Sequence, residues 1–359
     1  MREDSVLQVC NMSSLTCIEN SNEPGIEDNQ WSLEKVCKEI VLSDTFSTSE
    51  KDQIHDMLMR QNEVLSLGDD DVGLALKGEY RIELYDNTPI YQKMRRFPEP
   101  VTRAIEQQCT ELENLDIIEP SNSPWSSPLV PIKKPDGTVR LCVDYRKLNR
   151  VTIADKFPMP NLTDSIYSLH GTKYFTTLDL VRGYYQMEIE PGSREYTAFS
   201  TSQGHWQFKR LSFGLKNAPS AFQRLMQEIL KKFSRKKVII YIDDILIMED
   251  NLEDHLKLVE EVLRTLIENG IKVKPGKCHW VMEKVQYLGH IIGREGIEKS
   301  PEYVDRIVNF PKPKTVKEMR SFLGLVNFQR KFVPRCSDIM KPLSVLAGGK
   351  NTRKIKWNC

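Results

Sequence analysis

Short apolar runs and longer amphipathic segments alternate along the chain. The short runs are rich in β-branched and aromatic residues, which predicts strands at residues 173–180, 238–242, 245–248 and 285–292, the last with a glycine inside it. The longer segments place apolar residues on one helical stripe, which predicts helices near 101–115, at 218–233, at 254–270 and from Thr315 onward. Two further short helices are expected between residues 31 and 67. No internal repeat is found, and the chain is expected to mix strands and helices.

Turn and cap residues support several of these boundaries. Pro219 suits the first turn of a helix, Asn269-Gly270 suits a helix stop, and Thr315 and Glu318 have the spacing of a capping box. Prolines are dense between residues 98 and 134, which forces extended segments and turns. The Pro-Asp-Gly sequence at 135–137 then separates two strand-like runs, which predicts a hairpin.

Length and composition narrow the class of protein. A chain of 359 residues suggests two or three subdomains, and 40% apolar with 28% charged residues is typical of a soluble protein. No window approaches the roughly 18 apolar residues of a membrane span, and the N-terminus lacks the apolar stretch of a signal peptide. The eight cysteines form no C-x-x-C pair, so neither a zinc site nor a disulfide framework is predicted. Reduced thiols in an intracellular protein are expected.

The net charge of +1 hides an asymmetry. Residues 1–90 carry 7 Lys and Arg against 19 Asp and Glu, whereas residues 91–359 carry 44 against 31. The last 61 residues alone carry 14 against 4. A basic C-terminal half suits a polyanionic partner such as nucleic acid, although a positive face is often only a solvated one.

Two aspartates, Asp243 and Asp244, stand between the two apolar runs 238–242 and 245–248. Burying a carboxylate costs several kcal/mol unless its charge is compensated. One interpretation is a hairpin whose turn happens to be Asp-Asp, because Asp favours turns. The other is a hairpin that delivers two carboxylates to a hard ion such as Mg²⁺, in which case a third acid on a neighbouring strand is expected. Asp179, at the end of the run 173–180, is the candidate, and three such acids could hold two Mg²⁺ ions for phosphoryl transfer.

Four motifs carry a family resemblance. FTTLDLVRGYYQMEI, LSFGLKNAPSAFQRLM, YIDDILI and VQYLGHIIG occur in the order and at about the spacing of the palm motifs of reverse transcriptases. The chain most closely resembles the gypsy class of LTR retrotransposons and their retroviral relatives. The likeness covers roughly residues 80–346, and SPWSSPLVPIKKPDGTVRLCVDYRKLN and EMRSFLGLVNFQRKFVPRCSDIMKPLSVL are similar to the fingers and thumb of that family.

The resemblance implies an α+β right-hand polymerase with fingers, a palm built on an antiparallel sheet, and a helical thumb. The implied parts are an acidic and partly disordered N-terminal linker at 1–79, fingers at 80–167, a palm at 168–293 with 183–203 contributing to the fingers, a thumb and start of the connection at 294–346, and a truncated junction at 347–359 toward a missing ribonuclease H domain.

The resemblance also implies roles for individual residues. Asp179, Asp243 and Asp244 would be the catalytic residues and would ligate two Mg²⁺ ions, with Mn²⁺ as a substitute. Tyr184 would be the side chain that excludes a ribose 2′-hydroxyl. The other implied deoxynucleotide-binding residues are Arg140, Lys133, Lys134, Phe213 and Gly214. Leu288 and Gly289 resemble the primer grip, and either Lys274 or Lys277 is the lysine that protonates pyrophosphate.

The implied function is an RNA-directed and DNA-directed DNA polymerase. Its expected partners are a primed RNA or DNA template, deoxynucleoside triphosphates and other parts of a Pol polyprotein, with no membrane. No ribonuclease H activity is expected, and the expected location is the cytoplasm, in a retroelement particle, or the nucleus. Two alternatives stay open: a catalytically inactive, truncated relic that only binds nucleic acid, and a two-metal nuclease, for which a further acid cluster is lacking.

Overall fold

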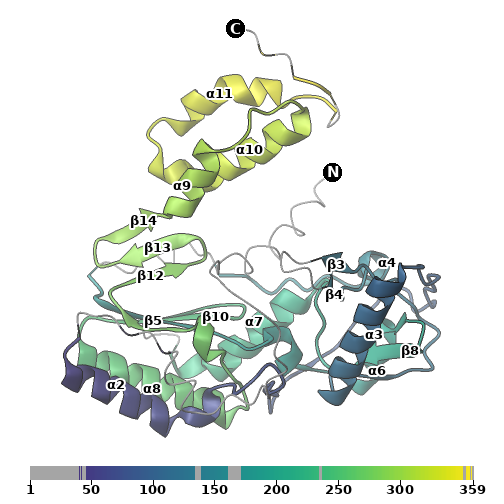
Figure 1. Ribbon diagram of the computed structural model, residues 1–359, viewed down its shortest axis with the longest axis horizontal. Coiled ribbons are helices and arrows are strands. Elements are labelled where there is room, and N and C mark those ends of the chain that lie inside the picture. The colour runs from purple at the N-terminus through teal and green to yellow at the C-terminus, as the bar shows by residue number, and fades with distance from the viewer. Residues whose placement is uncertain are drawn as a thin grey trace. The chain divides into compact units, whose positions relative to one another are not determined.

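The computed structural model describes residues 40, 42, 46–133, 139–160, 171–233, 237–350, 353–355 and 357, and for Lys133, Lys299 and Lys331 it describes the backbone. Figure 1 shows the order of the elements along the chain. Among the described residues, no helix combines the length and the apolar composition needed to cross a membrane.

A four-stranded antiparallel sheet lies at the centre of the fold, in the order β11-β5-β10-β9. The strands are β5 (Tyr174–Asp179), β9 (Val238–Tyr241), β10 (Asp244–Glu249) and β11 (His279–Met282). The register pairs Asp244 with Asp179 at one end and Glu249 with Tyr174 at the other. Both faces of the two inner strands are covered: residues 174–178 of β5 and 245–248 of β10 are all buried, and β10 accordingly has four apolar residues in a row instead of an alternating pattern.

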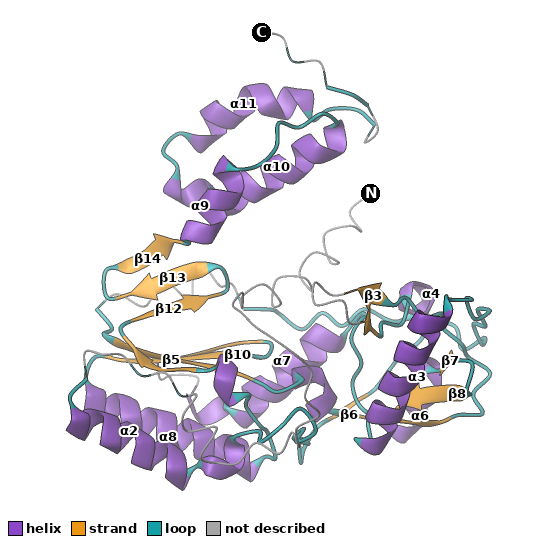
Figure 2. Cartoon of the chain, in the orientation of Figure 1, coloured by secondary structure: helices purple, strands orange, loops and turns teal. Residues whose placement is uncertain are grey.

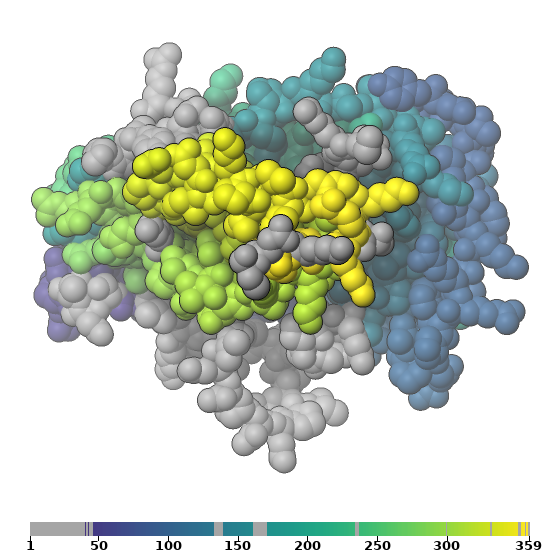
Figure 3. Space-filling model, turned by 90° about the horizontal axis from the view of Figure 1, so that it is seen from above, coloured from purple at the N-terminus to yellow at the C-terminus, as the bar shows by residue number. Residues whose placement is uncertain are grey.

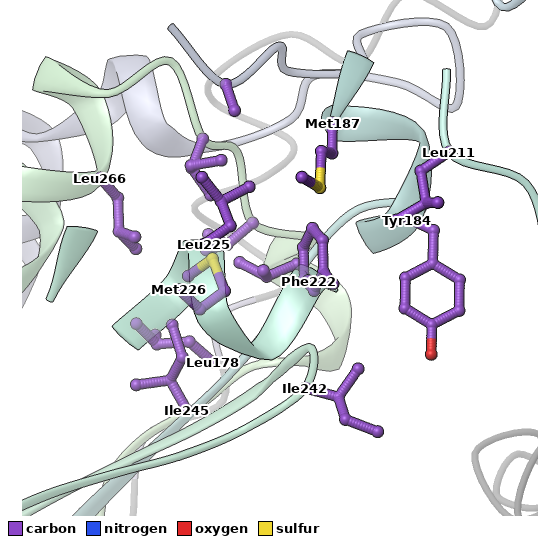
Figure 4. Close-up of a cluster of buried hydrophobic side chains, with 14 of the residues drawn as sticks. Leu178, Tyr184, Met187, Leu211, Phe222, Leu225, Met226, Ile242, Ile245 and Leu266 are labelled. Atoms are coloured by element: carbon purple, nitrogen blue, oxygen red, sulfur yellow. The ribbon is translucent and has the colours of Figure 1, made fainter. Parts of the chain in front are cut away.

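Three helices lie on one face of this sheet (Figure 2). They are α2 (Thr48–Arg60), α7 (Ala218–Ile229) and α8 (Leu252–Glu268). The apolar stripe of α7, including Phe222, Leu225 and Met226, packs in the same core as Leu178 of β5 and Ile245 of β10 (Figure 4). The opposite face carries Phe175, Leu246 and Met248, which cluster with side chains of the next sheet.

That next sheet has three antiparallel strands, β12 (Lys284–Tyr287), β13 (His290–Gly293) and β14 (Gly296–Lys299). It leads into the helices α9 (Pro301–Val308), α10 (Val316–Phe328) and α11 (Cys336–Leu346), with the turn η7 (Arg330–Phe332) between the last two. Figure 3 shows these helices, in green to yellow, on the face turned toward the viewer.

The remaining elements form smaller sheets and turns. A three-stranded sheet contains β2 (Ile118–Pro120), β8 (His205–Phe208) and β7 (Phe199–Ser200), and α3 (Glu99–Asn114) precedes it. β3 (Ile132–Lys133) pairs with β4 (Val139–Arg140), and β1 (Glu79–Tyr80) runs parallel to β6 (Glu188–Ile189). Short helical pieces connect them: η2 (Asn62–Val64), α4 (Arg146–Val151), η3 (Gly183–Gln186), α6 (Pro191–Arg194), η4 (Glu195–Thr197), η5 (Lys231–Phe233) and η6 (Pro275–Lys277).

The structure confirms the predicted α+β class and most of the predicted helices. Three predictions need correction. Residues 285–292 are not one strand but two, because Leu288 and Gly289 both have positive φ angles (49° and 78°) and form a turn between β12 and β13. Asp244 belongs to β10, so the turn between β9 and β10 consists of Ile242 and Asp243 alone. The predicted helix at 218–233 ends at Ile229, and a 3₁₀ turn follows it.

Two local predictions have a mixed outcome. Between 31 and 67, the described residues contain one α-helix, α2, and one 3₁₀ turn, η2, and residues 31–39 lie outside the described part. The hairpin at 132–140 is present, but its Pro-Asp-Gly turn also lies outside the described residues. At α10, the Thr315 hydroxyl accepts the N–H of Glu318 as expected, and the Glu318 carboxylate accepts the N–H of Lys314.

Candidate active site

The three predicted carboxylates meet at one end of the central sheet. Asp179 is the last residue of β5, Asp244 is the first of β10, and the two face each other across the antiparallel ladder. Directly opposed residues in such a ladder have Cα atoms about 4.5–5.5 Å apart and side chains on the same face. Asp243 precedes Asp244 in the two-residue turn that joins β9 to β10. The hairpin therefore brings the acids together, as the sequence predicted.

All three aspartates are partly buried, the side chain of Asp179 being 29% exposed, and this partial burial makes the carboxylates harder to ionise. It raises the pKa of Asp179 to about 6, against the attraction of Lys277, and raises the pKa of Asp244 to about 7, with the neighbouring Asp243 and Asp179 adding to the rise. Burial also raises the pKa of Asp243. The Nζ of Lys277 lies 4.0 Å from Oδ2 of Asp179, but the Lys277 side chain is 53% exposed to solvent. One solvated lysine leaves most of the negative charge uncompensated.

This donor set fits a hard divalent cation. All three groups offer carboxylate oxygens, which Mg²⁺ prefers, and their burial favours an ion that removes the charge. Within the described part of the chain, no group of three or more His, Cys, Asp or Glu side chains has by itself the arrangement needed to hold a metal ion. Mg²⁺ is commonly held by one or two carboxylates together with substrate phosphates, so an open set of acids is what a phosphoryl-transfer site requires.

Gly183 lies directly against Asp243. A Cβ atom added to Gly183 would stand 3.0 Å from the Cβ of Asp243 and 3.6 Å from its Oδ2. A contact of 3.0 Å is shorter than most real Cβ contacts, so with any other residue at position 183 the Asp243 side chain or η3 would have to shift. Glycine lets η3 approach the turn that carries Asp243 without that shift. Gly183 was not among the predicted site residues, and because it lies beyond the end of β5 at Asp179, no strand pattern marked it.

The structure separates the two candidate lysines. Lys274 pairs with Asp69, its Nζ lying 2.8 Å from Oδ1. Lys277, in the 3₁₀ turn η6, is the one that faces Asp179. Lys277 is therefore the lysine positioned at the carboxylates.

Tyr184 and Phe213 form an aromatic pair close to the acids. Tyr184 follows β5 in η3, is 8% exposed, and its ring centre lies 4.9 Å from that of Phe213 and 5.6 Å from that of Phe222. Phe213 is 46% exposed. Gly214 has a φ of 88°, which favours glycine, and its carbonyl accepts a hydrogen bond of 2.8 Å from the side chain of Asn149 on α4. These contacts hold the Phe213-Gly214 loop beside Tyr184.

Arg140, one of the predicted triphosphate-binding cations, lies on a short hairpin that α3 anchors. Gln108 of α3 accepts the N–H of Leu141 at 2.8 Å and donates to the carbonyl of Val139. Between them, Arg140 is exposed on β4 and lies near enough to the Tyr185 hydroxyl to lower its pKa, although burial has the larger and opposite effect. The side chain of Lys133 and all of Lys134 lie outside what the structure describes.

The predicted primer grip connects the carboxylates to the C-terminal helices. The hydroxyl of Tyr287, next to Leu288, donates to the carbonyl of Asp244 at 3.3 Å. A Cβ on Gly289 would meet the rings of Tyr303 and Phe328 at 3.2 and 3.3 Å, so the turn packs closely on α9 and α10. No local sequence pattern indicated the Tyr287 contact, because it joins residues 43 positions apart.

Comparison with solved structures defines the class of fold. The structure of the foamy viral protease-reverse transcriptase dRH in complex with double-stranded DNA superposes with a TM-score of 0.85 and 27% identity, over 94% of this chain and 60% of that chain. The same viral protein in complex with an RNA/DNA hybrid gives a TM-score of 0.82 and 27% identity, over 94% and 46%. Residues 132–292 match the family model described as Reverse transcriptase (RNA-dependent DNA polymerase).

Comparison with curated proteins narrows the family. The chain is 40% identical to the Retrovirus-related Pol polyprotein from transposon 297 of Drosophila melanogaster over 72% of its length, and 34% identical to that from transposon gypsy of the same organism over 84%. It covers 25% and 30% of these two relatives, so it spans less than a third of their length. The chain belongs to the reverse transcriptases of LTR retrotransposons of the gypsy class.

The raised pKa of Asp244 predicts that replacing this acid with a neutral residue stabilises the folded protein, and that the gain depends on pH. Asp244 has a pKa of about 7 in the folded state, above the unfolded value near 3.9. Its protonated form therefore stabilises the fold below about pH 4, and this contribution is lost as the pH rises through 7. We expect metal-free Asp244→Asn to melt at a higher temperature than the parent at pH 8 and at the parent's temperature at pH 4. Each kcal/mol corresponds to about 2–4 °C in Tm.

The measurement is thermal unfolding in EDTA at both pH values. Asp250→Asn, which removes an acid whose side chain is 62% exposed, is the matched control and should leave the melting temperature within about 1 °C of the parent. A gain of equal size for Asp244→Asn at pH 4 and pH 8 would show that ionisation is not its cause.

The close contact of Gly183 predicts that Gly183→Ala displaces Asp243. A reacting group moved by a fraction of an ångström to 1 Å can lose up to about a hundredfold in rate, so we expect primer extension to fall roughly ten- to a hundredfold while circular dichroism shows an intact fold. Gly192→Ala, at a glycine with no atom within 4 Å of the added Cβ, should keep the activity of the parent. Equal activities of the two variants would contradict the account.

Proposed function

We propose that this chain is an RNA-directed and DNA-directed DNA polymerase, which extends a primer on an RNA or DNA template with deoxynucleotides. The observation that carries the proposal is the pairing of Asp179 with Asp244 beside Asp243, all with raised pKa values, in a chain that matches reverse transcriptases. The solved neighbours bound to double-stranded DNA and to an RNA/DNA hybrid support a primed template as the partner. Other parts of a Pol polyprotein are further partners that the relatives support.

The carboxylates are the groups that would hold two Mg²⁺ ions, with Mn²⁺ as a substitute. When bound, such ions stabilise the charge on the attacking and leaving oxygens of the transferred phosphoryl group. The carboxylates themselves set where the primer 3′ end must lie, because they share one end of a rigid sheet. Lys277, beside Asp179, is placed to give a proton to the departing pyrophosphate.

The surrounding side chains account for substrate binding. Arg140, exposed on its anchored hairpin, suits bidentate contact with a triphosphate. Tyr184 and Phe213 form a pair of tilted aromatic rings next to the acids, and such a wall of rings is suited to excluding a ribose 2′-hydroxyl by its bulk. A relic that only binds nucleic acid would have no need of three partly buried carboxylates with raised pKa values, which lower stability at neutral pH.

Primer extension on poly(rA)/oligo(dT) with Mg²⁺ tests the proposal. We expect the parent to add deoxythymidylate and Asp243→Asn to lose several orders of magnitude, because the substitution keeps the shape but removes a charged ligand. Asp250→Asn, an exposed acid at the far end of β10, should extend primers like the parent. An inactive parent, or an Asp243→Asn variant within a few-fold of it, would overturn the proposal.

The wall formed by Tyr184 predicts its effect on sugar choice. Tyr184→Ala removes the ring that packs on Phe213 and opens space, so we expect ribonucleotide incorporation relative to deoxynucleotide to rise about tenfold or more. Tyr184→Phe keeps the ring and should behave nearly like the parent. Competition between rNTP and dNTP in single-nucleotide extension measures the ratio, which is independent of the fraction of folded protein. An unchanged ratio in Tyr184→Ala would place the selection elsewhere.

A further inference from the structure

The turn that carries Asp243 has an unfavourable backbone. Tyr241 pairs with Asp244, so Ile242 and Asp243 are the two turn residues, and Ile242 has a φ of 57°. Glycine is the usual residue at the first position of such a turn, and a β-branched residue with positive φ is strained. The Ile242 side chain is nevertheless buried, at 9% exposure, and lies close to the apolar cluster of Figure 4. Something must hold the backbone in this conformation.

Gln223 of α7 makes two hydrogen bonds to the backbone, one at the strained residue itself and one two residues before it. Its Oε1 accepts the N–H of Ile242 at 2.6 Å, and its Nε2 donates to the carbonyl of Ile240 at 3.1 Å. The Gln223 side chain is fully buried. An amide is the side-chain group that can accept and donate at once in this arrangement, and both bonds are lost if the turn relaxes to a negative φ.

We infer that Gln223 is a positioning residue for Asp243: it holds the strained Ile242 turn and thereby fixes the direction of the Asp243 carboxylate. The inference rests on the proposed function in so far as Asp243 is catalytic. Strain is retained at functional sites only where surrounding structure holds it, and here the hold comes from a helix that also supplies Phe222, 3.7 Å from the Cβ position of Gly183. Asp243 is thus held from α7 on one side and limited by Gly183 on the other.

Gln186 provides a matched comparison. It is also fully buried and also bonds only to backbone, donating to the carbonyls of Val181 and Lys272 and accepting the N–H of Lys272. Neither of these partner residues has a positive φ angle. A purely structural role predicts that Gln223 and Gln186 behave alike on substitution, whereas the positioning role predicts that only Gln223 is coupled to the conformation of Ile242.

The first test does not depend on activity. The variants are Gln223→Met, which keeps the size of the side chain and removes both bonds, Ile242→Gly, which adopts positive φ without strain, and the double variant, with Gln186→Met as control. We expect Gln223→Met to speed hydrogen exchange of the residue 242 amide about tenfold or more, and Gln186→Met to leave it unchanged. In thermal unfolding, Ile242→Gly should be less harmful in the Gln223→Met background than in the parent, by a few degrees in Tm.

The second test reads the consequence for the active site. We expect Gln223→Met to lower kcat for primer extension about tenfold while Kd for primer–template stays within twofold, and Ile242→Gly to restore most of that loss in the double variant. If Gln223→Met does not fold, the double variant decides, and it is expected to fold and to extend primers.

Three results would overturn the inference. They are additive effects of Gln223→Met and Ile242→Gly on Tm, an unchanged exchange rate at residue 242, and a double variant as impaired as Gln223→Met. An inactive parent chain would instead contradict the proposed function, and the exchange and unfolding measurements would still decide the role of Gln223.

Discussion

The pairing of β5 with β10 is the contact on which the rest of the site depends. It sets Asp179 opposite Asp244 at the end of a sheet that is covered on both faces, so two partly buried carboxylates lie side by side with one solvated lysine nearby. The same burial that makes the strands stable makes the acids difficult to ionise. A site of this kind is destabilising without a cation and strongly selective for one when it is present.

The surroundings of the acids are arranged around that pairing. The helix α7 bonds to the Asp243 turn through Gln223, the η3 turn approaches it through Gly183, and the β12–β13 hairpin bonds to Asp244 through Tyr287. Two of these three segments also carry a residue with a proposed substrate contact: Tyr184 follows Gly183, and Leu288 follows Tyr287. Positioning of the acids and binding of the substrates therefore share the same short segments.

The sequence predicted the features that depend on local pattern. Apolar runs marked β5, β9 and β10, the helical stripe marked α7, and the isolated acids at strand ends marked the site. It failed where a contact joins distant residues: the bonds from Gln223 and Tyr287 go to backbone atoms 19 and 43 positions away, and no local pattern encodes them. It also read 285–292 as one strand, because Leu288 is apolar and its positive φ is set by the hairpin and not by its own preference.

If the partly buried Asp179 and Asp244 hold a divalent cation, they must give up their protons when the cation binds. Calorimetric titration of Mn²⁺ into the protein with primer–template, in two buffers of different ionisation enthalpy, counts those protons. With pKa values of about 6 and 7 at Asp179 and Asp244, the predicted release is on the order of one proton per molecule near pH 6, falling toward zero by pH 9. Cation binding that releases no protons at pH 6, or equal numbers of protons at pH 6 and pH 9, would contradict the role of these carboxylates in holding the cation.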